Sequence, residues 1–565
     1  MRVRTYIGLK INLVQKVKHS FYYYAFFILA VESNLTAFFY YGVIMRIGLF
    51  FLGFLFVGNN FTMMDNRPTK EEFLKNFFDG TFTNIIDFTR YLVNVYPETH
   101  DLASSDVEVT AEGALAQGIS SISMQIYNKH YGEFDRSVAG VWFLYLYVNK
   151  KYAETHALFA KPENKKWLDQ AIAIFNEYFY TKGIIDREKI EALIVSLVLN
   201  DIGKVNKIHN LVGQAIDHDA VLSLMLNNQA KYSKYIPSFV ALNDNQQQLI
   251  REYFSAGMSI PQLAQAENVP GSAINFVQLP RNIRVFGFWE AFFDVSGAGA
   301  HVQDFSKLQS VMNPFVLPTY LTAYGVISSQ SWDLDRRAND TKAFELYWHT
   351  VDNVLLAKNL SDLFNVAYAP NSNSFFQLGR YTSKKDEAIR KEYCLARLIA
   401  QARISPANIE SFKKDFESLT EEDQTILING MSRDGISEKT MMIYYAPALF
   451  TSLGTDKKSA LEILARLYNA GETLLQQNSS KIFTINIREI ASPKIIGVAA
   501  NKDALKNGEF HFNVNGDIAY AKLGGDAGRA KGQLSLDEDM ENFSNDLLII
   551  YSTNDVTSAI MVSHQ

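Results

Sequence analysis

A group of polar residues able to bind a metal ion follows an apolar run in the stretch Ser196–Leu222, which reads SLVLNDIGKVNKIHNLVGQAIDHDAVL. Its polar and charged residues of interest are Asn200, Asp201, Lys204, His218 and Asp219. Carboxylate, amide and imidazole groups are common ligands of divalent cations. The structural alternative is that Asp201 caps a turn, that His218 is half-buried, and that the acidic residues beside it are a charged helix N-terminus.

The element that must position Asp201 is an amphipathic helix that begins after Asp186, a residue suited to the N-cap. The apolar residues of this helix recur at helical spacing and are Ile190, Leu193, Ile194, Leu197 and Val198. They bring Asp201 to the buried end of the helix, and Gly203 permits a turn there. A second helix at roughly Leu211–Leu226 is expected to carry His218, 17 residues after Asp201. Two consecutive helices would then direct their polar groups toward one point.

Helical periodicity extends through residues 63–480 and predicts a mainly all-α fold with an irregular helical core. The expected helices include Ile85–Val95, Val138–Val148, Trp167–Tyr180, Phe344–Leu356, Lys385–Arg403, Pro406–Phe416, Glu421–Met431 and Lys457–Gln476. The Val and Tyr content of Val138–Val148 also permits a strand.

The pattern changes after Asn478. Alternating or short apolar runs predict strands at Lys481–Ile487, Lys494–Val498, Glu509–Val514 and Leu547–Tyr551. Asn515-Gly516 is a hairpin signal after the third of them. The predicted organisation is an N-terminal apolar segment at 1–62, a helical domain at 63–330, a further helical region at 331–480 and a small β or α+β appendage at 481–565.

The sequence Leu199–Lys204, LNDIGK, resembles the His-Asp-Ile-Gly-Lys signature of the HD-domain metal-dependent phosphohydrolases. The resemblance implies an all-α core in which an upstream His, the His-Asp pair and a distant Asp hold a divalent metal. Asp201 matches the paired Asp, and His218 resembles an added histidine of some members. Asp294, within FFDVSGAGAH, resembles the distant Asp and comes 93 residues after Asp201. This later motif also resembles an uncharacterised HD-like family of bacteria and fungi.

Two departures from the HD pattern bear on activity. Asn200 stands in place of the paired His, and Arg136 stands where the upstream His is expected. The remaining ligand set is rich in oxygen and consists of Asn200, Asp201, His218, Asp219 and Asp294. Such a set favours Fe, Mn or Mg over Zn.

The chemistry that the resemblance implies is hydrolysis of a phosphate ester in a small phosphorylated molecule by metal-activated water. Lys204 or Arg136 would bind a phosphate oxygen, and His301 or His218 would donate a proton to the leaving group. Arg281 and Arg284 are further candidates for a phosphate contact, with salt bridging as the alternative. The rival hypothesis is a non-catalytic HD-like scaffold or small-molecule-binding protein, because two expected histidines are replaced.

The charge and composition of the chain limit the classes of partner that it is expected to bind. The whole chain carries −6 and residues 1–62 carry +5, which leaves −11 for residues 63–565. An acidic body repels nucleic acid, and the helix-turn-helix-like segment Gln246–Leu279 has no Lys or Arg in its third part, Gly271–Leu279. The single cysteine, Cys394, excludes a disulfide framework within the chain and is expected to be buried.

The apolar stretch Phe21–Val57 has three interpretations: translated DNA upstream of a start at Met63-Met64, a transmembrane anchor, or a signal peptide. Membrane association is expected only if residues 1–62 are translated. The body at 63–565 is otherwise expected to be cytoplasmic.

Overall fold

The computed structural model describes residues 68–104, 119–151, 162–212, 218–314, 316–356 and 387–477, with strand segments at 481–486, 509–514, 517–522, 549–550 and 560–561. Backbone contacts divide the chain into two units, Met1–Thr69 and Lys70–Gln565, and the described helices and strands belong to the second. The stretch Phe21–Val57 lies outside the described residues. No helix within them is long and apolar enough to cross a membrane.

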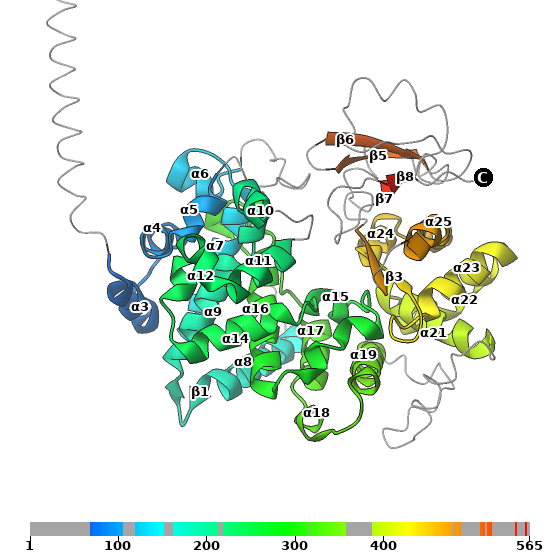
Figure 1. Ribbon diagram of the computed structural model, residues 1–565, viewed down its shortest axis with the longest axis horizontal. Coiled ribbons are helices and arrows are strands. Elements are labelled where there is room, and N and C mark those ends of the chain that lie inside the picture. Colours follow the sequence, from blue (N-terminus) through cyan, green and yellow to red (C-terminus); the bar gives the residue numbers. More distant parts are fainter. Residues whose placement is uncertain are drawn as a thin grey trace, which may run out of the picture. The chain divides into compact units, whose positions relative to one another are not determined.

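Helices make up most of the described residues of this second unit (Figure 1), so the predicted mainly all-α fold class is confirmed. As far as residue 327 the α-helices are α3 (Lys70–Asp79), α4 (Ile85–Val95), α5 (Glu98–Leu102), α6 (Ile122–Tyr127), α7 (Gly132–Val148), α8 (Pro162–Phe179), α9 (Arg187–Leu199), α10 (Asn206–Val212), α11 (His218–Asn227), α12 (Gln229–Tyr232), α13 (Pro237–Val240), α14 (Asp244–Ser255), α15 (Ile260–Ala264), α16 (Arg281–Gly297) and α17 (Leu317–Ile327). After it they are α18 (Ser331–Leu334), α19 (Asn339–Leu356), α21 (Glu387–Gln401), α22 (Ile409–Glu417), α23 (Glu421–Ser432), α24 (Ala446–Ser452) and α25 (Lys457–Gln477).

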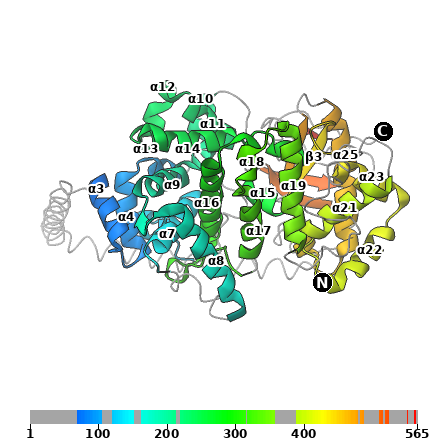
Figure 2. The same cartoon turned by 90° about the horizontal axis from the view of Figure 1, so that it is seen from below.

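Helices α7 and α16 pack against each other within the helical body (Figure 2). The segment Val138–Val148 is buried throughout and forms the C-terminal part of α7, because a long apolar run enclosed on all sides favours a core helix. A Cβ atom at Gly297 would lie 2.3 Å from the carbonyl oxygen of Arg136, so the two backbones meet only because residue 297 is glycine. This close approach brings the part of α7 that carries Arg136 beside the C-terminal end of α16, which carries Asp294.

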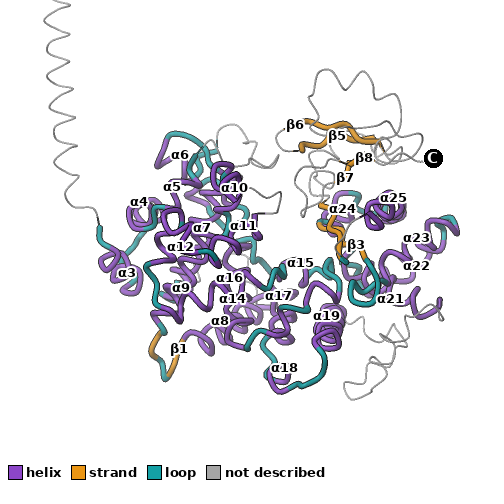
Figure 3. Tube along the Cα trace, viewed as in Figure 1, coloured by secondary structure: helices purple, strands orange, loops and turns teal. Residues whose placement is uncertain are grey.

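The strands among the described residues form four two-stranded sheets (Figure 3). They are β1 (Tyr180–Thr181) with β2 (Ile184–Ile185), β3 (Thr440–Tyr444) with β4 (Ile482–Asn486), β5 (Glu509–Val514) with β6 (Asp517–Lys522), and β7 (Ile549–Ile550) with β8 (Ile560–Met561). The pair β3–β4 is parallel and the other three pairs are antiparallel. Three of the predicted strand segments coincide with β4, β5 and β7, whereas Lys494–Val498 and the turn Asn515-Gly516 lie outside the described residues.

The sequence did not predict β3. Its residues TMMIY are four buried side chains followed by a half-buried one, which is a continuous apolar run without alternation. Such a short run has the same appearance in a buried strand and in a buried helix. Its partner β4 begins 38 residues after β3 ends, with Thr440 paired to Ile482, so tertiary pairing decided its conformation.

Glu267, between α15 and the 3-10 helix η7 (Pro270–Ala273), connects this part of the chain to the segment that follows β3. Its carboxylate accepts a hydrogen bond from the backbone N–H of Tyr445 at 2.6 Å, at the turn between β3 and α24. The next residue, Asn268, accepts a hydrogen bond from the Tyr444 hydroxyl at 3.2 Å. Glu267 is 1% exposed, and burial raises the pKa of its carboxyl to about 8.

The substitution Glu267→Gln should remove part of the pH dependence of folding. The native carboxyl holds a proton that the unfolded chain releases, so the free energy of unfolding of the wild type falls as pH rises from about 4.5 to about 8. Glutamine keeps the acceptor for Tyr445 and does not ionise. Urea unfolding at several pH values should show a relative gain for the variant on the order of 4 kcal/mol across this range.

The matched control is Glu438→Gln, at an exposed position. Its free energy of unfolding should run parallel to that of the wild type at every pH. Parallel curves for Glu267→Gln and the wild type would contradict a protonated native Glu267.

Candidate functional site

Asp201 stands at the buried end of α9, as predicted. The Asp186 side chain accepts a hydrogen bond from the Lys189 backbone N–H at 3.1 Å and caps the N-terminus of α9. Every residue of α9 from Ala192 to Leu199 is buried, so the helix enters the core and delivers Asp201 there, only 3% exposed. The local signals of cap and apolar stripe were therefore sufficient to place this carboxylate.

Gly203, within the 3-10 helix η5 (Ile202–Lys204), sets the distance between this turn and α11. A Cβ atom at residue 203 would lie 2.2 Å from the carbonyl oxygen of His218. The turn therefore needs glycine because a backbone passes directly over it. The predicted second helix differs from the structure: α10 ends at Val212 and α11 begins at His218, so His218 and Asp219 lie in the first turn of α11.

Buried charges from α7 and η5 form a network around Asp201. The Lys204 ammonium lies 2.7 Å from Asp201 Oδ1 and 3.1 Å from Glu133 Oε2. The Arg136 guanidinium lies 2.9 Å from the same Glu133 oxygen. Glu133 is 5% exposed, so two cations share two carboxylates away from water. We name these four residues, Glu133, Arg136, Asp201 and Lys204, the ion-pair network.

The three acids in and beside the ion-pair network have pKa values that are shifted in different directions. Burial opposes the charge on Asp201, but Lys204 and Arg136 outweigh it and hold the pKa of Asp201 well below its usual range. Asp294 lies close enough to interact electrostatically with the same charged groups. Its pKa is raised to about 6, mainly by burial and next by the negative charge of Asp201. Burial also raises the pKa of Glu290, on the same helix, well above its usual value, and Asp294 adds to this effect. The ion-pair network thus favours the ionised form of Asp201, whereas burial favours the protonated form of Glu290.

The structure brings together only some of the predicted site residues. Arg136, Asp201, Lys204 and Asp294 interact electrostatically, and His218 contributes to the field at Asp201. The side chains of His218 and Asp219 are 39% and 57% exposed and lie 3.3 Å apart. Asn200 is half-buried at the C-cap of α9. Their role as metal ligands stays a prediction.

The metal that the resemblance implies has no preformed group of ligands in the part of the chain that the structure describes. No group of three or more His, Cys, Asp and Glu residues that could hold a metal occurs among the residues that the structure describes. One oxygen of Asp201 is already bound by Lys204, although the other, Oδ2, has no hydrogen-bond partner. A bound metal at this donor set therefore stays a prediction.

His301 belongs to a different polar cluster. It is buried in the 3-10 helix η9 (Ala300–Val302), where its Cβ lies 3.6 Å from the position that a Cβ of Gly132 would occupy. It acts electrostatically on His130, whose ring nitrogen Nδ1 lies 3.0 Å from Ser121 Oγ and 3.4 Å from Asp135 Oδ2. Burial lowers the pKa of His130, and it raises that of Asp135 to about 7.

One residue of the site, Glu133, was missed in the sequence. It lies three residues before Arg136, and this spacing on a helix face is a signal for an ion pair. Glu290, in the Arg- and aromatic-rich run 281–301, was expected only as part of a pocket wall, because its approach to the ion-pair network depends on how α16 packs. Arg284 does not serve a phosphate, because its guanidinium binds Asp333 at 2.8 Å and the backbone oxygens of Ile327 and Ser329. Arg281 makes the salt bridge of the alternative interpretation, with Glu177 at 3.0 Å.

Replacing Lys204 with methionine should strongly destabilise the protein. The substitution leaves the Asp201 carboxylate buried beside only one remaining cation, and breaking a buried ion pair from one side costs about 3–5 kcal/mol. Chemical denaturation followed by circular dichroism measures the loss.

The control is Lys207→Met, the same change three residues later. Lys207 pairs with Asp101, but its side chain is 52% exposed, so the loss should stay within about 1 kcal/mol. Equal losses for the two variants would show that the ion-pair network is no more stabilising than a surface pair.

Comparison with known proteins identifies the family but not an activity. A model of a family of unknown function, DUF6829, matches residues 94–469, which include the whole ion-pair network and both neighbouring acids. No curated protein and no solved structure matches the chain. Because the match spans more than half of the 565 residues, the chain belongs to the family of unknown function DUF6829.

Proposed function

We propose that this chain is a divergent HD-like protein in which buried side-chain cations stand in place of the metal ion, so that it acts as a non-catalytic scaffold or small-molecule-binding protein. The observation that carries the proposal is the position of the Lys204 ammonium between Asp201 Oδ1 and Glu133 Oε2, at 2.7 and 3.1 Å. A lysine there neutralises the carboxylate that matches the metal-binding Asp of the HD pattern.

Arg136 supports the same proposal. It stands at the position where the resemblance expects the upstream His, and it interacts with both acids of the pattern, Asp201 and Asp294. Burial opposes its charge, but Glu133, Asp201 and Asp294 more than compensate, so the pKa of Arg136 lies above its ordinary value. A guanidinium cannot donate a lone pair to a metal. The substitution therefore replaces a ligand with a cation that binds the remaining ligands itself.

Electrostatics then disfavours a divalent ion at this position. Two unit charges 4 Å apart interact by about 4 kcal/mol at the effective dielectric constant of partly buried sites. A dication at the same distance from Lys204 or Arg136 would meet about twice this repulsion, about 8 kcal/mol, from each, and this opposes its attraction to the carboxylates. It would also have to displace Lys204 from Asp201 Oδ1, which would leave Glu133 with one cation fewer.

A second function is favoured by one observation, the unpartnered oxygen Oδ2 of Asp201 with Asp294 in its field. Magnesium is often bound through one or two carboxylates together with substrate phosphates. In this candidate function Asp201 and Asp294 would hold the ion, which supplies activated water for hydrolysis of a phosphate ester. Arg136 and Lys204 would bind phosphate oxygens of a small phosphorylated substrate.

Metal analysis of the full chain separates the two functions. We expect the purified wild type to contain far less than one equivalent of Mg, Mn or Fe, and its melting temperature to be unchanged when these ions are added. It should hydrolyse none of a panel of phosphate esters. One bound equivalent that is lost in Asp201→Asn, or metal-dependent hydrolysis lost in the same variant, would overturn the scaffold proposal and support the phosphohydrolase.

A gain-of-function variant tests the HD-like arrangement itself. The double substitution Arg136→His, Asn200→His restores the His, His-Asp and Asp set of the pattern. We expect Mn or Fe to raise its melting temperature, since a ligand at 100 times its Kd stabilises by about 2.7 kcal/mol. Adding Asp201→Ala should abolish the rise. A folded double variant that binds no metal would contradict the proposed correspondence of these positions.

A further inference from the structure

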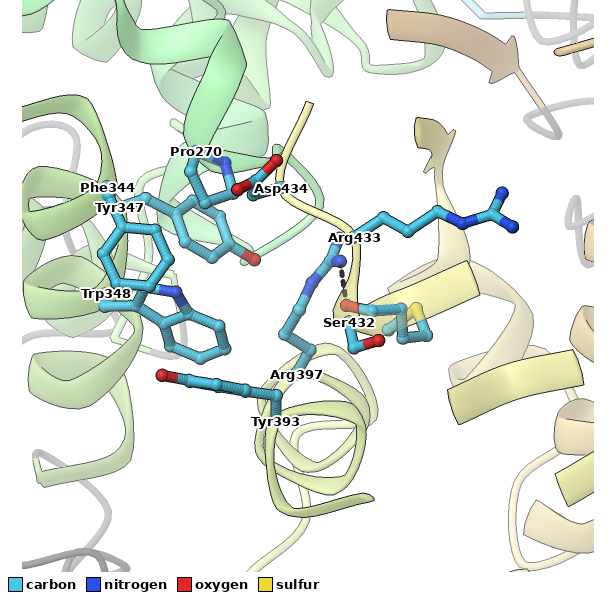
Figure 4. A pocket seen from close by; sticks show the side chains of 10 residues that line it. Pro270, Phe344, Tyr347, Trp348, Tyr393, Arg397, Ser432, Arg433 and Asp434 are labelled. Carbon is cyan, nitrogen blue, oxygen red and sulfur yellow. Dashed lines mark hydrogen bonds between the residues drawn. The ribbon is translucent and has the colours of Figure 1, made fainter. Parts of the chain in front are cut away.

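A small hollow outside the ion-pair network is lined by aromatic rings and by the buried side chain of Arg397 (Figure 4). It lies among α19, α21, the C-terminal end of α23 and η7. The space that the centre of a water molecule can reach measures about 10 Å³, which is room for about one water molecule. The hollow therefore excludes any ligand much larger than a single water molecule or a single ion.

Arg397 brings a positive charge into this region without a carboxylate to balance it. It is 1% exposed and takes part in no salt bridge within the described part of the chain. Its Nη1 donates to the carbonyl oxygen of Met431 at 2.6 Å and its Nη2 to that of Asn268 at 3.2 Å. Its Nε has no hydrogen-bond partner. The guanidinium thus meets neutral dipoles and keeps one unused N–H.

Two other arginines are neutralised in the ordinary way. Arg284 is fully buried and pairs with Asp333 at 2.8 Å, and Arg433, which also lines the hollow, pairs with Glu472 at 2.6 Å. Figure 4 shows the Arg433 side chain extending away from the aromatic rings. Burial of an unpaired ion is strongly unfavourable, so natural proteins compensate such charges. A bound anion would supply the partner that Arg397 lacks.

The charges around the hollow leave an excess of one positive charge. Arg397, Arg433 and Asp434 line it, Arg390 donates to a serine hydroxyl of its lining at 2.9 Å, and Glu472 pairs with Arg433. Three arginines and two carboxylates make a net charge of +1. The Asp434 carboxylate is held by two backbone N–H groups and a hydroxyl of the turn that follows it, and it forms no salt bridge with Arg397. One monovalent anion would balance the group.

The size of the hollow selects the kind of anion. Carboxylates, phosphates and sulfate all have several heavy atoms and need more room than one water molecule leaves. The rings of Trp348 and Tyr393 lie 4.3 Å apart, so they pack against each other and leave no space for an organic group between them. A monatomic anion needs little more room than a water molecule. A charge-assisted hydrogen bond from a guanidinium N–H is a strong contact for such an ion.

From these observations we propose that the hollow binds a single chloride ion, held by the Nε–H of Arg397 beside the rings of Tyr347, Trp348 and Tyr393. The ion supplies the negative charge that the chain lacks at this point. It stabilises the folded protein where α19, α21, α23 and η7 meet. The site does not involve the ion-pair network, so it goes beyond the proposed function and stands whether or not that function is correct.

Thermal unfolding of the full chain tests the proposal, with chloride replaced stepwise by gluconate at constant ionic strength. The melting temperature of the wild type should rise with chloride. An ion that binds one site of the folded chain adds about 1.4 kcal/mol to the free energy of unfolding for each tenfold increase above its Kd. Arg397→Met should lose this dependence, whereas Arg90→Met, which removes an exposed arginine of α4, should keep it. A wild type that does not respond to chloride, or an Arg397→Met variant that responds as strongly, overturns the proposal.

Bromide in crystals of the wild type locates the ion directly and covers the case in which Arg397→Met does not fold. Bromide takes the place of chloride and is recognised by its anomalous scattering. We expect one anomalous peak in the hollow, within hydrogen-bond distance of Arg397 Nε. A hollow without a peak overturns the proposal. A peak in a protein whose melting temperature is independent of chloride identifies an adventitious ion only, and this result overturns the proposal as well.

Discussion

The ammonium group of Lys204, shared by Asp201 and Glu133, is the interaction on which the buried centre of the helical body depends. It neutralises the carboxylate that α9 carries into the core and ties the turn after α9 to the start of α7. Without it, the buried Asp201 carboxylate would lose its nearest cation and only Arg136 of the ion-pair network would remain, and breaking a buried ion pair from one side is strongly destabilising. The close packing of Gly203 under α11 and of Gly297 against α7 holds the same elements together sterically.

The same requirement explains why the acids around the network behave differently. Asp201 interacts with two cations, Lys204 and Arg136, which lower its pKa and so favour its ionised form. Burial and the charge of Asp201 raise the pKa of Asp294 to about 6. Glu290, four residues before Asp294 on α16, has its pKa raised by burial first and then by Asp294. The ion-pair network and burial therefore act on these three acids to different extents.

Local signals in the sequence were reliable where they did not depend on distant partners. The Asp186 cap and the apolar stripe predicted α9, and the apolar run Val138–Val148 predicted a core helix that became the C-terminal part of α7. Strand β3 was missed because its five residues carry no periodicity and its partner lies far along the chain. Of the proposed site, Asp201, Lys204, Arg136 and Asp294 were chosen from a motif resemblance, and the fold places them in one electrostatic field. Glu133 was not selected because a single Glu on a helix does not indicate which distant residue it will contact.

The sequence by itself determined the helical class, the cap and burial of α9, the acidic body and the residue types available for chemistry, because these follow from local periodicity and composition. Only the tertiary structure decided what those residues do to one another. It put Lys204 on Asp201, joined Arg136 to Glu133, and placed His301 close enough to His130 to affect its pKa. It also buried the Arg397 guanidinium, which donates to the carbonyl oxygens of Met431 and Asn268. The physical reason is that ion pairing and desolvation depend on distances of a few ångströms between segments far apart in the chain, and no local pattern encodes those distances.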